Sequence, residues 1–400
     1  MTTFDDLAGL VPNSPWAEVD WAALLEAIPA LRALAATPQD PIHHAEGDVW
    51  THTRMVVDEL RRLADFEAAG ESGRFVLFYA ALLHDVAKPP CTVVHEDGRV
   101  SSPGHSRRGA VDARVLLWRA GVPFDLRERI ARIVQHHQMP FFAVKGDRSG
   151  RSPECIVRRL ASEVSLRELA TVAEADARGR VCADGGETLV NIELFRLMAE
   201  EDGCLDSPRA FPDAATRVAY FRGNGAISPD YPFHVEFGSR VTVLSGLPAA
   251  GKDTWSAENA QGRAVLSFDA ARAELGVRHG TDAAGGAAHL VVERAKDLLR
   301  RQEPFVWNAT HLSEESRQRT LDLLYRYGAE VEIVYLESPE DVIRRRNRDR
   351  DTTLTDAAID RMLHHWEVPS AREAHEVRHL VSGMEGAERH RRAQACAQRP

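Results

Sequence analysis

The chain has 400 residues, of which 44% are apolar and 28% charged, and its formal net charge at pH 7 is −10. This length exceeds what one hydrophobic core usually serves, so we expect two domains. The acidic balance excludes a protein that coats nucleic acid through a broad basic surface, although a few local arginines could still hold a strand end.

Residues 1–222 are expected to form an all-α domain, because apolar side chains recur there at helical spacing. One such stripe consists of Trp50, Met55, Val56, Leu60 and Leu63. A second apolar run, residues 74–86, stops before Pro89 and Pro90, since a residue that precedes proline is disfavoured in helical conformation.

Histidines and aspartates recur at the ends of these helical segments. In chain order they are His52, the pair His84-Asp85 in Leu-Leu-His-Asp-Val-Ala-Lys88-Pro, and Asp176. A single histidine on an apolar face is usually a core residue with its hydrogen bonds made, so the prediction of a metal site depends on all four residues together. Neutral imidazoles and carboxylates are ligands of first-row transition metals, and a carboxylate can bridge two ions.

The order H…HD…D resembles the HD-domain metal-dependent phosphohydrolases over roughly residues 43–200. In that family the four residues bind one metal, and further histidines between the pair and the last aspartate bind a second. His105 and His137 are similarly placed, and His136 could exchange roles with His137. We interpret His43 and His44 as a solvated loop pair.

The resemblance implies two metal ions, and His-rich ligation favours Mn, Ni, Co, Fe or Zn over Mg. Such a site would hold a phosphate, lower the pKa of a bound water and stabilise the leaving oxygen. Asp85 is expected to bridge the ions. Lys88 and Arg108 could neutralise phosphate oxygens; the alternative for each is an ordinary solvent-exposed side chain.

Residues 223–239 are rich in glycine and proline and are predicted to be a linker. Beyond them, strand-like segments alternate with helix-like segments over residues 240–382, which predicts a parallel sheet covered by helices and ligands at the carboxyl ends of its strands. The strand-like segments are 240–245, 264–267, 305–308 and 331–336. Residues 383–400 are polar and arginine-rich and are expected to fray.

The first strand-like segment enters a glycine-rich turn, Gly246-Leu-Pro-Ala-Ala-Gly251-Lys252-Asp253-Thr254. This is the layout of a phosphate-binding loop, in which Gly246 and Gly251 free the backbone and Lys252 reaches the outer phosphates of ATP or another NTP with Mg²⁺. Asp253 stands where a serine or threonine normally offers its hydroxyl to Mg²⁺, and Thr254 comes one place later. Either side chain could take that role.

Asp269 follows the second strand-like segment, and Arg272 shares its face of the next helix. Asp269 could take the proton from an attacking hydroxyl while Arg272 holds a phosphate of the acceptor; a helix N-cap with a solvated arginine is the alternative. Farther on, residues 344–350 contain five arginines. Charge runs are usually solvated helix faces, but an arginine-bearing lid could stabilise a phosphoryl group in transfer.

These segments resemble the phage-type 5′-hydroxyl polynucleotide kinases over roughly residues 238–382. The matching motifs are Gly-x-Pro-x-x-Gly-Lys-x-Thr-Trp, Asp269-x-x-Arg272, Asn308-Ala-Thr310-His311, Arg346-Asn-x-x-Arg350 and Pro369-Ser-Ala-Arg-Glu-Ala-His375-Glu-Val. The resemblance implies that Lys252 binds phosphates, Asp269 is the general base and Arg272 contacts the acceptor strand. It also implies that Arg346 and Arg350 clamp the donor phosphates. Two positions depart from the family: Asp253 replaces Ser/Thr, and Asn308 replaces an aspartate common among members.

The two halves together are similar to the bacterial end-healing enzymes called HD-Pnk. This similarity implies that the HD domain hydrolyses 2′,3′-cyclic, 2′- or 3′-phosphate ends and that the kinase domain phosphorylates a 5′-hydroxyl end of RNA or DNA, before a ligase acts. The alternatives are an HD nucleotidase fused to a small-molecule kinase, or a nucleotide-sensing regulator. Since no apolar run could span a bilayer and the five cysteines form no C-x-x-C motif, we expect a cytoplasmic protein with reduced thiols and no membrane partner.

Overall fold

The computed structural model describes residues 2–147, 150–182, 185–277, 284–349 and 354–382. They form two compact units, the first ending at Ala210 and the second beginning at Phe211. The division falls before the predicted linker, because α12 (Ala214–Arg222) groups with the second unit. Within that unit Arg217 donates hydrogen bonds to the carbonyl oxygens of Ala371, Ala374 and His375. Among the described residues, no helix is long and apolar enough to cross a membrane.

The first unit is helical, as predicted, with a two-residue antiparallel strand pair joining α6 to α7. Its elements are α1 (Phe4–Gly9), α2 (Trp21–Ala27), η1 (Pro29–Ala36), α3 (Val49–Leu60), α4 (Ala64–Ala68), α5 (Glu71–Leu83), α6 (Lys88–Cys91), β1 (Val93–Val94), β2 (Val100–Ser101), α7 (His105–Arg119), α8 (Phe124–His136), η2 (Met139–Phe141), η3 (Ala143–Lys145), α9 (Pro153–Ala161), α10 (Leu166–Arg178) and α11 (Gly185–Glu201).

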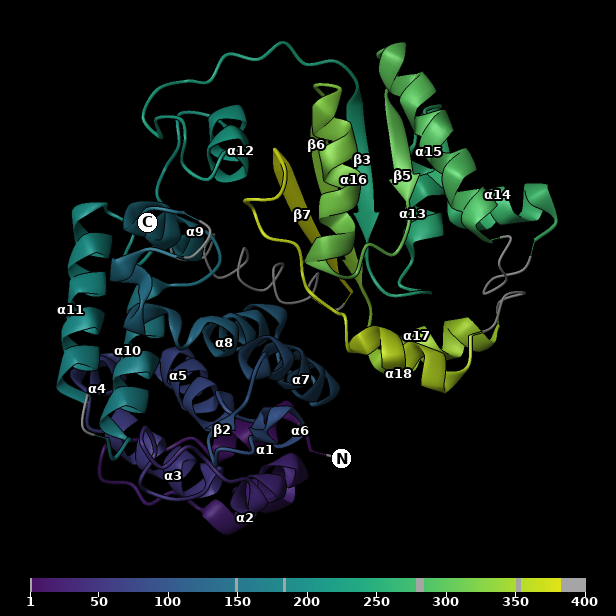
Figure 1. Ribbon diagram of the computed structural model, residues 1–400. Coiled ribbons are helices and arrows are strands. Elements are labelled where there is room, and N and C mark those ends of the chain that lie inside the picture. The colour runs from purple at the N-terminus through teal and green to yellow at the C-terminus, as the bar shows by residue number, and fades with distance from the viewer. Residues whose placement is uncertain (1, 148–149, 183–184, 278–283, 350–353, 383–400) are drawn as a thin grey trace, which may run out of the picture. The chain divides into compact units, whose positions relative to one another are not determined.

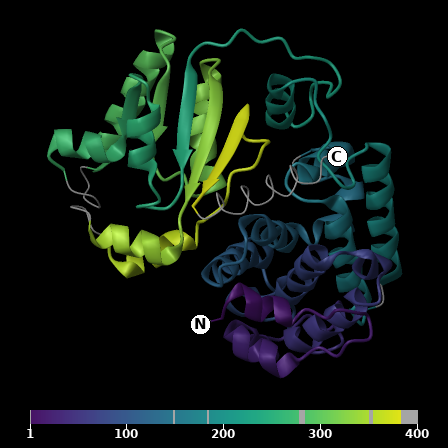
Figure 2. The same ribbon diagram turned by 180° about the vertical axis from the view of Figure 1, so that it is seen from behind.

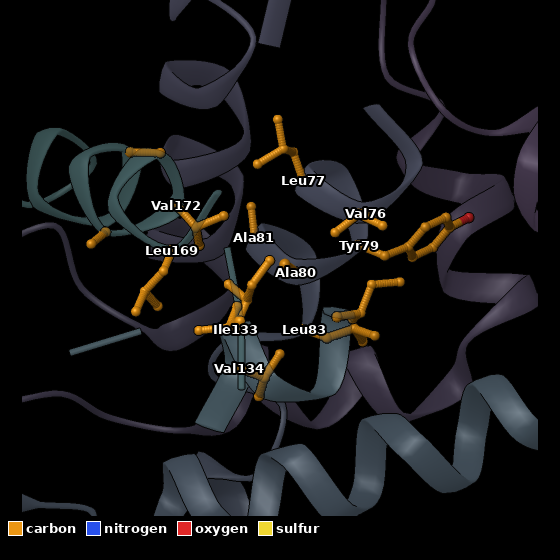
Figure 3. Packing of buried hydrophobic residues seen from close by; sticks show 14 of the residues in the cluster. Val76, Leu77, Tyr79, Ala80, Ala81, Leu83, Ile133, Val134, Leu169 and Val172 are labelled. Atoms are coloured by element: carbon orange, nitrogen blue, oxygen red, sulfur yellow. The ribbon is translucent and has the colours of Figure 1, made fainter. Parts of the chain in front are cut away.

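Helix α5 is the centre of this unit. Every residue from Phe75 to Leu83 is buried, and a helix that is apolar on all sides must be surrounded by other elements. Figure 3 shows Ala80, Ala81 and Leu83 among Ile133 and Val134 of α8, with Leu169 and Val172 of α10 nearby. Because α5 ends at Leu83, the next two residues, His84 and Asp85, emerge directly from the core.

The second unit contains a five-stranded parallel sheet in the order β4-β5-β3-β6-β7 (Figure 1, and from behind in Figure 2). After α12 its elements are β3 (Arg240–Ser245), α13 (Lys252–Asn259), β4 (Ala264–Ser267), α14 (Phe268–Leu275), α15 (Ala284–Arg300), β5 (Phe305–Asn308), α16 (Glu314–Arg326), β6 (Glu330–Glu337), α17 (Glu340–Arg348), α18 (Asp356–Leu363) and β7 (Glu376–Val381).

Both faces of this sheet are covered, which confirms the predicted α/β class. Alternate residues of a strand point to opposite faces. On β3, Val241 and Val243 join the apolar cluster that includes residues of α14, α15 and α16, whereas Leu244 joins a second cluster with Trp255 of α13. The turn from β3 into α13 therefore lies at the carboxyl end of a central strand, between β5 and β6.

Candidate active sites

Six side chains of the helical unit converge from five helices, at or next to a helix end in five of the six cases. His52 is on α3, His84 and Asp85 follow α5, His105 begins α7, His137 follows α8, and Asp176 is in the last turn of α10. All six are buried. The packing of α3, α5, α7, α8 and α10 thus assembles the ligands that the sequence spreads over residues 52–176.

Asp85 lies between two groups of imidazoles. Its Oδ2 is 3.1 Å from His84 Nε2 and 2.7 Å from Lys88 Nζ. Its Oδ1 is 3.3 Å from His105 Nε2 and 4.0 Å from His137 Nε2. One carboxylate oxygen therefore faces each group, which is the arrangement that a bridging ligand requires.

Each imidazole is oriented by its other ring nitrogen. The Nδ1–H groups of His84, His105 and His137 donate to the carbonyl oxygens of Ala81, Ser102 and Val134, at 2.7, 2.7 and 2.8 Å. Such bonds fix the tautomer, so each Nε2 presents its lone pair to the cluster. His52 Nε2 is 3.1 Å from Asp176 Oδ1.

The donors fit two transition-metal ions. Three possible ligand groups occur among the described residues, and two of them are fully buried: His52, His84 and Asp176, and Asp85, His105 and His137. The third is His44, Glu46 and His52, and within each group the ligand atoms lie within 4.8 Å of one another. His84 Nε2, His137 Nε2 and both Asp85 oxygens are buried without a hydrogen bond of regular geometry, although Asp85 Oδ2 is ion-paired with Lys88. Buried polar atoms of this kind are costly, and a bound cation would satisfy them.

The electrostatics keep His137, Asp85 and Asp176 in their metal-binding forms. Burial would lower the pKa of His52, but its bonds to Asp176 and Glu46 raise it. Burial, followed by the neighbouring His84, lowers the pKa of His137 to about 3, so this imidazole is neutral. Burial alone would raise the pKa of Asp85 and Asp176, but His84 and Lys88 beside Asp85 hold it well below its ordinary value. Arg180 and His52 do the same for the pKa of Asp176. Metal binding requires neutral histidine and ionised carboxylate.

Three supporting residues were missed by the sequence analysis. Glu46 Oε1 lies 2.9 Å from His52 Nδ1 and 2.8 Å from His44 Nδ1. Gln39 Oε1 accepts a hydrogen bond from Lys88 Nζ at 2.7 Å, and Arg180 grips Asp176 through two bonds of 2.9 and 2.7 Å. Only Arg180, one helical turn after Asp176, had a spacing that could have revealed it.

The expectation for His44 needs correction, and contacts of Arg108 and His136 bear on two alternatives that the sequence left open. The side chain of His44 is only 11% exposed and its ring meets that of His52 at 4.7 Å, so it is not a solvated loop residue. Arg108 is paired with Asp112 at 2.9 Å, one turn along the same helix. His136 Nε2 lies 3.1 Å from Glu163 Oε2, so the structure brings His137 rather than His136 into the cluster.

A pocket of about 410 Å³ opens over this cluster. Lys88, His105 and Arg180 line it together with the rings of Phe141 and Phe142, and Phe142 is 59% exposed. The Arg180 guanidinium lies 4.8 Å from the centre of the Phe141 ring. Cationic groups and aromatic surface therefore share one opening.

The glycine-rich turn of the second unit has the backbone of a strained loop. Gly246 has φ +146°, and a Cβ there would collide with the carbonyl oxygen of Leu336, so only glycine fits. Gly251 has φ +107° immediately before α13. Lys252 is buried, and its Nζ donates to the carbonyl oxygens of Gly246 and Leu247 at 3.0 and 2.8 Å.

The other predicted kinase residues lie on the elements that follow the strands. Asp269 and Arg272 form an ion pair across the first turn of α14, whose N-cap is Ser267 rather than Asp269. Arg346 of α17 reaches the loop, with Nη1 3.4 Å from the carbonyl oxygen of Ala249 and 3.3 Å from Ser338 Oγ. Arg350 lies outside the described residues. Thr254 is exposed in the first turn of α13.

One motif of the kinase resemblance, and the first arginine of the run at residues 344–350, make contacts within the fold itself. Glu373, within the Pro369 motif, accepts two hydrogen bonds from the buried Arg317, at 2.6 and 3.1 Å. Arg344 of the arginine run binds Glu340 of its own helix and Asp356 and Asp360 of α18, at 2.6, 2.8 and 2.6 Å. These contacts hold helices and loops of the fold together, whereas Arg346, among the described arginines of the run, contacts the loop.

Comparison with known proteins assigns each unit to a domain class. Residues 49–179 match the family described as HD domain, and residues 241–369 match the family described as AAA domain. The chain therefore joins an HD domain of the phosphohydrolase type to a P-loop, kinase-like domain.

Similar proteins include multifunctional CCA proteins from three bacteria. That of Methylococcus capsulatus is 29% identical over 201 residues, which is 45% of this chain and 44% of that protein. That of Halorhodospira halophila is 32% identical over 115 residues, or 29% of this chain and 25% of that protein. That of Xanthomonas oryzae pv. oryzae is 27% identical over 218 residues, half of each chain. The chain spans half or less of the length of these relatives.

Proposed function

We propose that this protein heals nucleic-acid ends. Its HD domain would hydrolyse 2′,3′-cyclic, 2′- or 3′-phosphate ends, and its P-loop domain would transfer the γ-phosphate of an NTP to a 5′-hydroxyl end. The observation that supports this most is the presence, in one chain, of a buried two-group metal-ligand cluster and a phosphate-binding loop with a nearby carboxylate. The first would remove phosphate from an ester and the second would add it to a hydroxyl.

In the HD domain, the ligand groups around His84 and His105 would hold two transition-metal ions. When bound, such ions coordinate a substrate phosphate, lower the pKa of a water and stabilise the leaving oxygen. The protein's own contribution is charge and position. Lys88, fixed between Gln39 and Asp85, and Arg180, fixed on Asp176, line the pocket and would neutralise phosphate oxygens.

The aromatic part of the same pocket supports a nucleotide rather than a small phosphate ester as the substrate. Phe142 presents an exposed ring beside the cationic groups. Proteins that bind single-stranded nucleic acid stack unpaired bases on such rings. A terminal nucleotide could therefore place its phosphate near Lys88 and its base against Phe142.

In the kinase domain, Lys252 would exchange its two carbonyl partners for the outer phosphates of the donor. Asp269 would take the proton of the 5′-hydroxyl, but its carboxylate is engaged in an ion pair with Arg272. A phosphate of the acceptor strand would compete for Arg272 and release the Asp269 carboxylate. Acceptor binding would thus prepare the base for proton transfer.

A small-molecule kinase joined to an HD nucleotidase is the main rival, since it would use the same loop and carboxylate. A nucleotide-sensing regulator is the rival from another class, but Asp269 and Arg346 would then have no task. Incubation of the full-length protein with γ-labelled NTP, Mg²⁺, Mn²⁺, a mixture of nucleosides and an oligonucleotide that carries a 5′-hydroxyl and a 3′-phosphate tests all three. End healing predicts label on the 5′ end and free phosphate from the 3′ end. Label only on nucleosides supports the first rival, and binding without turnover supports the second.

A further inference from the structure

The two positions that depart from the kinase pattern contact each other. Asn308 is the last residue of β5 and is 7% exposed, and its Nδ2 donates a hydrogen bond of 2.7 Å to Asp253 Oδ1 in the first turn of α13. The strand register explains the contact, because Asn308 is paired with Leu244, two residues before Gly246 on the adjacent strand β3. The backbone N–H of Gly246 also donates to the carbonyl oxygen of Thr310 at 2.9 Å.

In this contact the carboxylate and the neutral side chain have exchanged the positions that they commonly occupy in P-loop enzymes. P-loop enzymes commonly hold Mg²⁺ through a Ser or Thr hydroxyl at the loop and an Asp from a neighbouring strand. Here the carboxylate, Asp253, is at the loop and the neutral group, Asn308, is at the strand end. The pair keeps one negative charge and one neutral hydrogen-bonding group, with their positions exchanged.

Electrostatics explain why the two departures occur together. Two carboxylates at the Asp253–Asn308 distance would repel each other and favour protonation of one. Two neutral side chains would leave the donor's Mg²⁺ without a charged ligand. An amide at 308 instead donates to the carboxylate and fixes its orientation, and the N-terminal end of α13 also favours a negative charge at 253.

We propose that Asp253 contacts the Mg²⁺ of the nucleoside triphosphate and that Asn308 is the positioning residue that aims its carboxylate. The inference rests on the phosphotransferase half of the proposed function. It assigns the Mg²⁺ contact to Asp253 rather than to the hydroxyl of Thr254. It also predicts that a change at residue 253 or 308 alone weakens binding of the nucleotide or of its Mg²⁺, whereas matched changes at both positions do not.

Calorimetric titration of ATP into the full-length protein, with and without Mg²⁺ and without any acceptor, tests this inference. The measured quantity is the factor by which Mg²⁺ tightens ATP binding. Asp253→Thr should reduce this factor about tenfold, as expected for loss of one interaction with a charged group. Asn308→Asp should weaken binding of ATP about tenfold, because it sets two carboxylates against each other. The double variant Asp253→Thr/Asn308→Asp should recover most of both losses.

Two outcomes would overturn the inference: losses that simply add in the double variant, or an Mg²⁺ factor that Asp253→Thr leaves at the wild-type value. Thr254→Ala is the matched comparison and should weaken ATP binding equally with and without Mg²⁺. If Asn308→Asp does not fold, Asn308→Ala provides the test, since it should lower the Mg²⁺ factor while Asp253 is still present. No acceptor is used in this titration, so it does not depend on polynucleotide phosphorylation. If the variants show the expected pattern but the wild-type protein never phosphorylates a polynucleotide, the proposed function is refuted and the inference stands.

Discussion

His52 Nε2 lies 3.1 Å from Asp176 Oδ1, although 124 positions separate the two residues along the chain. The contact exists because α3 and α10 pack in one core around α5. The unfolded chain does not hold these two side chains together. The candidate metal centre is therefore a product of the packed helices, and metal binding should stabilise the folded helical unit by mass action.

Glu46 should contribute to metal affinity, because it orients the candidate ligand His52. We expect Glu46→Gln to weaken metal binding about 10- to 100-fold, because the carboxylate that orients His52 Nδ1 is removed. Titration of metal-free protein with Mn²⁺ or Zn²⁺ measures the effect. Glu163→Gln is the matched control, since Glu163 contacts His136, which is outside the cluster. Equal affinities in the Glu46→Gln variant and the wild type would show that Glu46 has no part in the site.

Asp269 and Arg272 should affect different kinetic constants of the phosphotransfer. Asp269→Ala should lower kcat by about 10²- to 10⁴-fold, the usual contribution of a positioned general base. Arg272→Ala should chiefly raise KM for an oligonucleotide and change KM for a mononucleoside acceptor much less, because only the longer acceptor supplies the phosphate that Arg272 would hold. Steady-state kinetics with both acceptors checks this. Parallel losses with the two acceptors would support a small-molecule kinase.

His311 should make the second unit sensitive to mild acid. It donates through Nδ1 to the carbonyl oxygen of Leu244 at 2.9 Å, and its Nε2 lies 3.0 Å from Thr320 Oγ1. Burial lowers its pKa from 6.5 to about 4. Between these values the unfolded chain binds the proton more readily, so stability should fall as the pH drops from 6.5 to 4, by at most about 1.4 kcal/mol per pH unit.

Chemical unfolding of the wild type and of His311→Asn at a series of pH values measures that dependence. Asparagine tolerates the positive φ of this position and keeps a donor for Leu244, but it does not titrate in this range. The variant should be less stable at pH 7 and should lose less stability than the wild type toward pH 4. Identical slopes would assign the acid sensitivity to other groups.

The boundary of the second unit should lie before α12. A fragment that begins at residue 211 retains α12, with its three Arg217 hydrogen bonds and the buried Tyr220 and Phe221. A fragment that begins at residue 226 lacks them and should be less stable by about 3 kcal/mol or more, given the apolar side chains removed. Urea unfolding of the two fragments compares them. Equal stability would place α12 outside the folded unit.

The parts that sequence reasoning found have strong local signals. Short apolar runs between helix-like segments predicted three of the strands of the parallel sheet with the bounds that the structure shows, and the order of histidines and aspartates predicted the metal-ligand candidates. Loops have no such periodicity, which is why Glu46 and Gln39 were missed. Strand β7 was missed because it is a largely exposed edge strand with charged residues, which resembles a loop. The Gly/Pro-rich stretch indicated a domain boundary, but it could not show with which unit α12 packs.

The most direct test of the account scores both ends of one oligonucleotide, with a 5′-hydroxyl and a 3′-phosphate or 2′,3′-cyclic phosphate, in two point variants of the full-length protein. Asp85→Ala removes the carboxylate between the two ligand groups and should end 3′ processing while 5′ phosphorylation survives. Lys252→Met should abolish 5′ phosphorylation while 3′ processing survives, because Lys252 belongs to the phosphate-binding loop and is not one of the helical unit's candidate metal ligands. A folded Asp85→Ala protein that no longer phosphorylates the 5′ end would contradict the account, since the two reactions would then depend on one composite site.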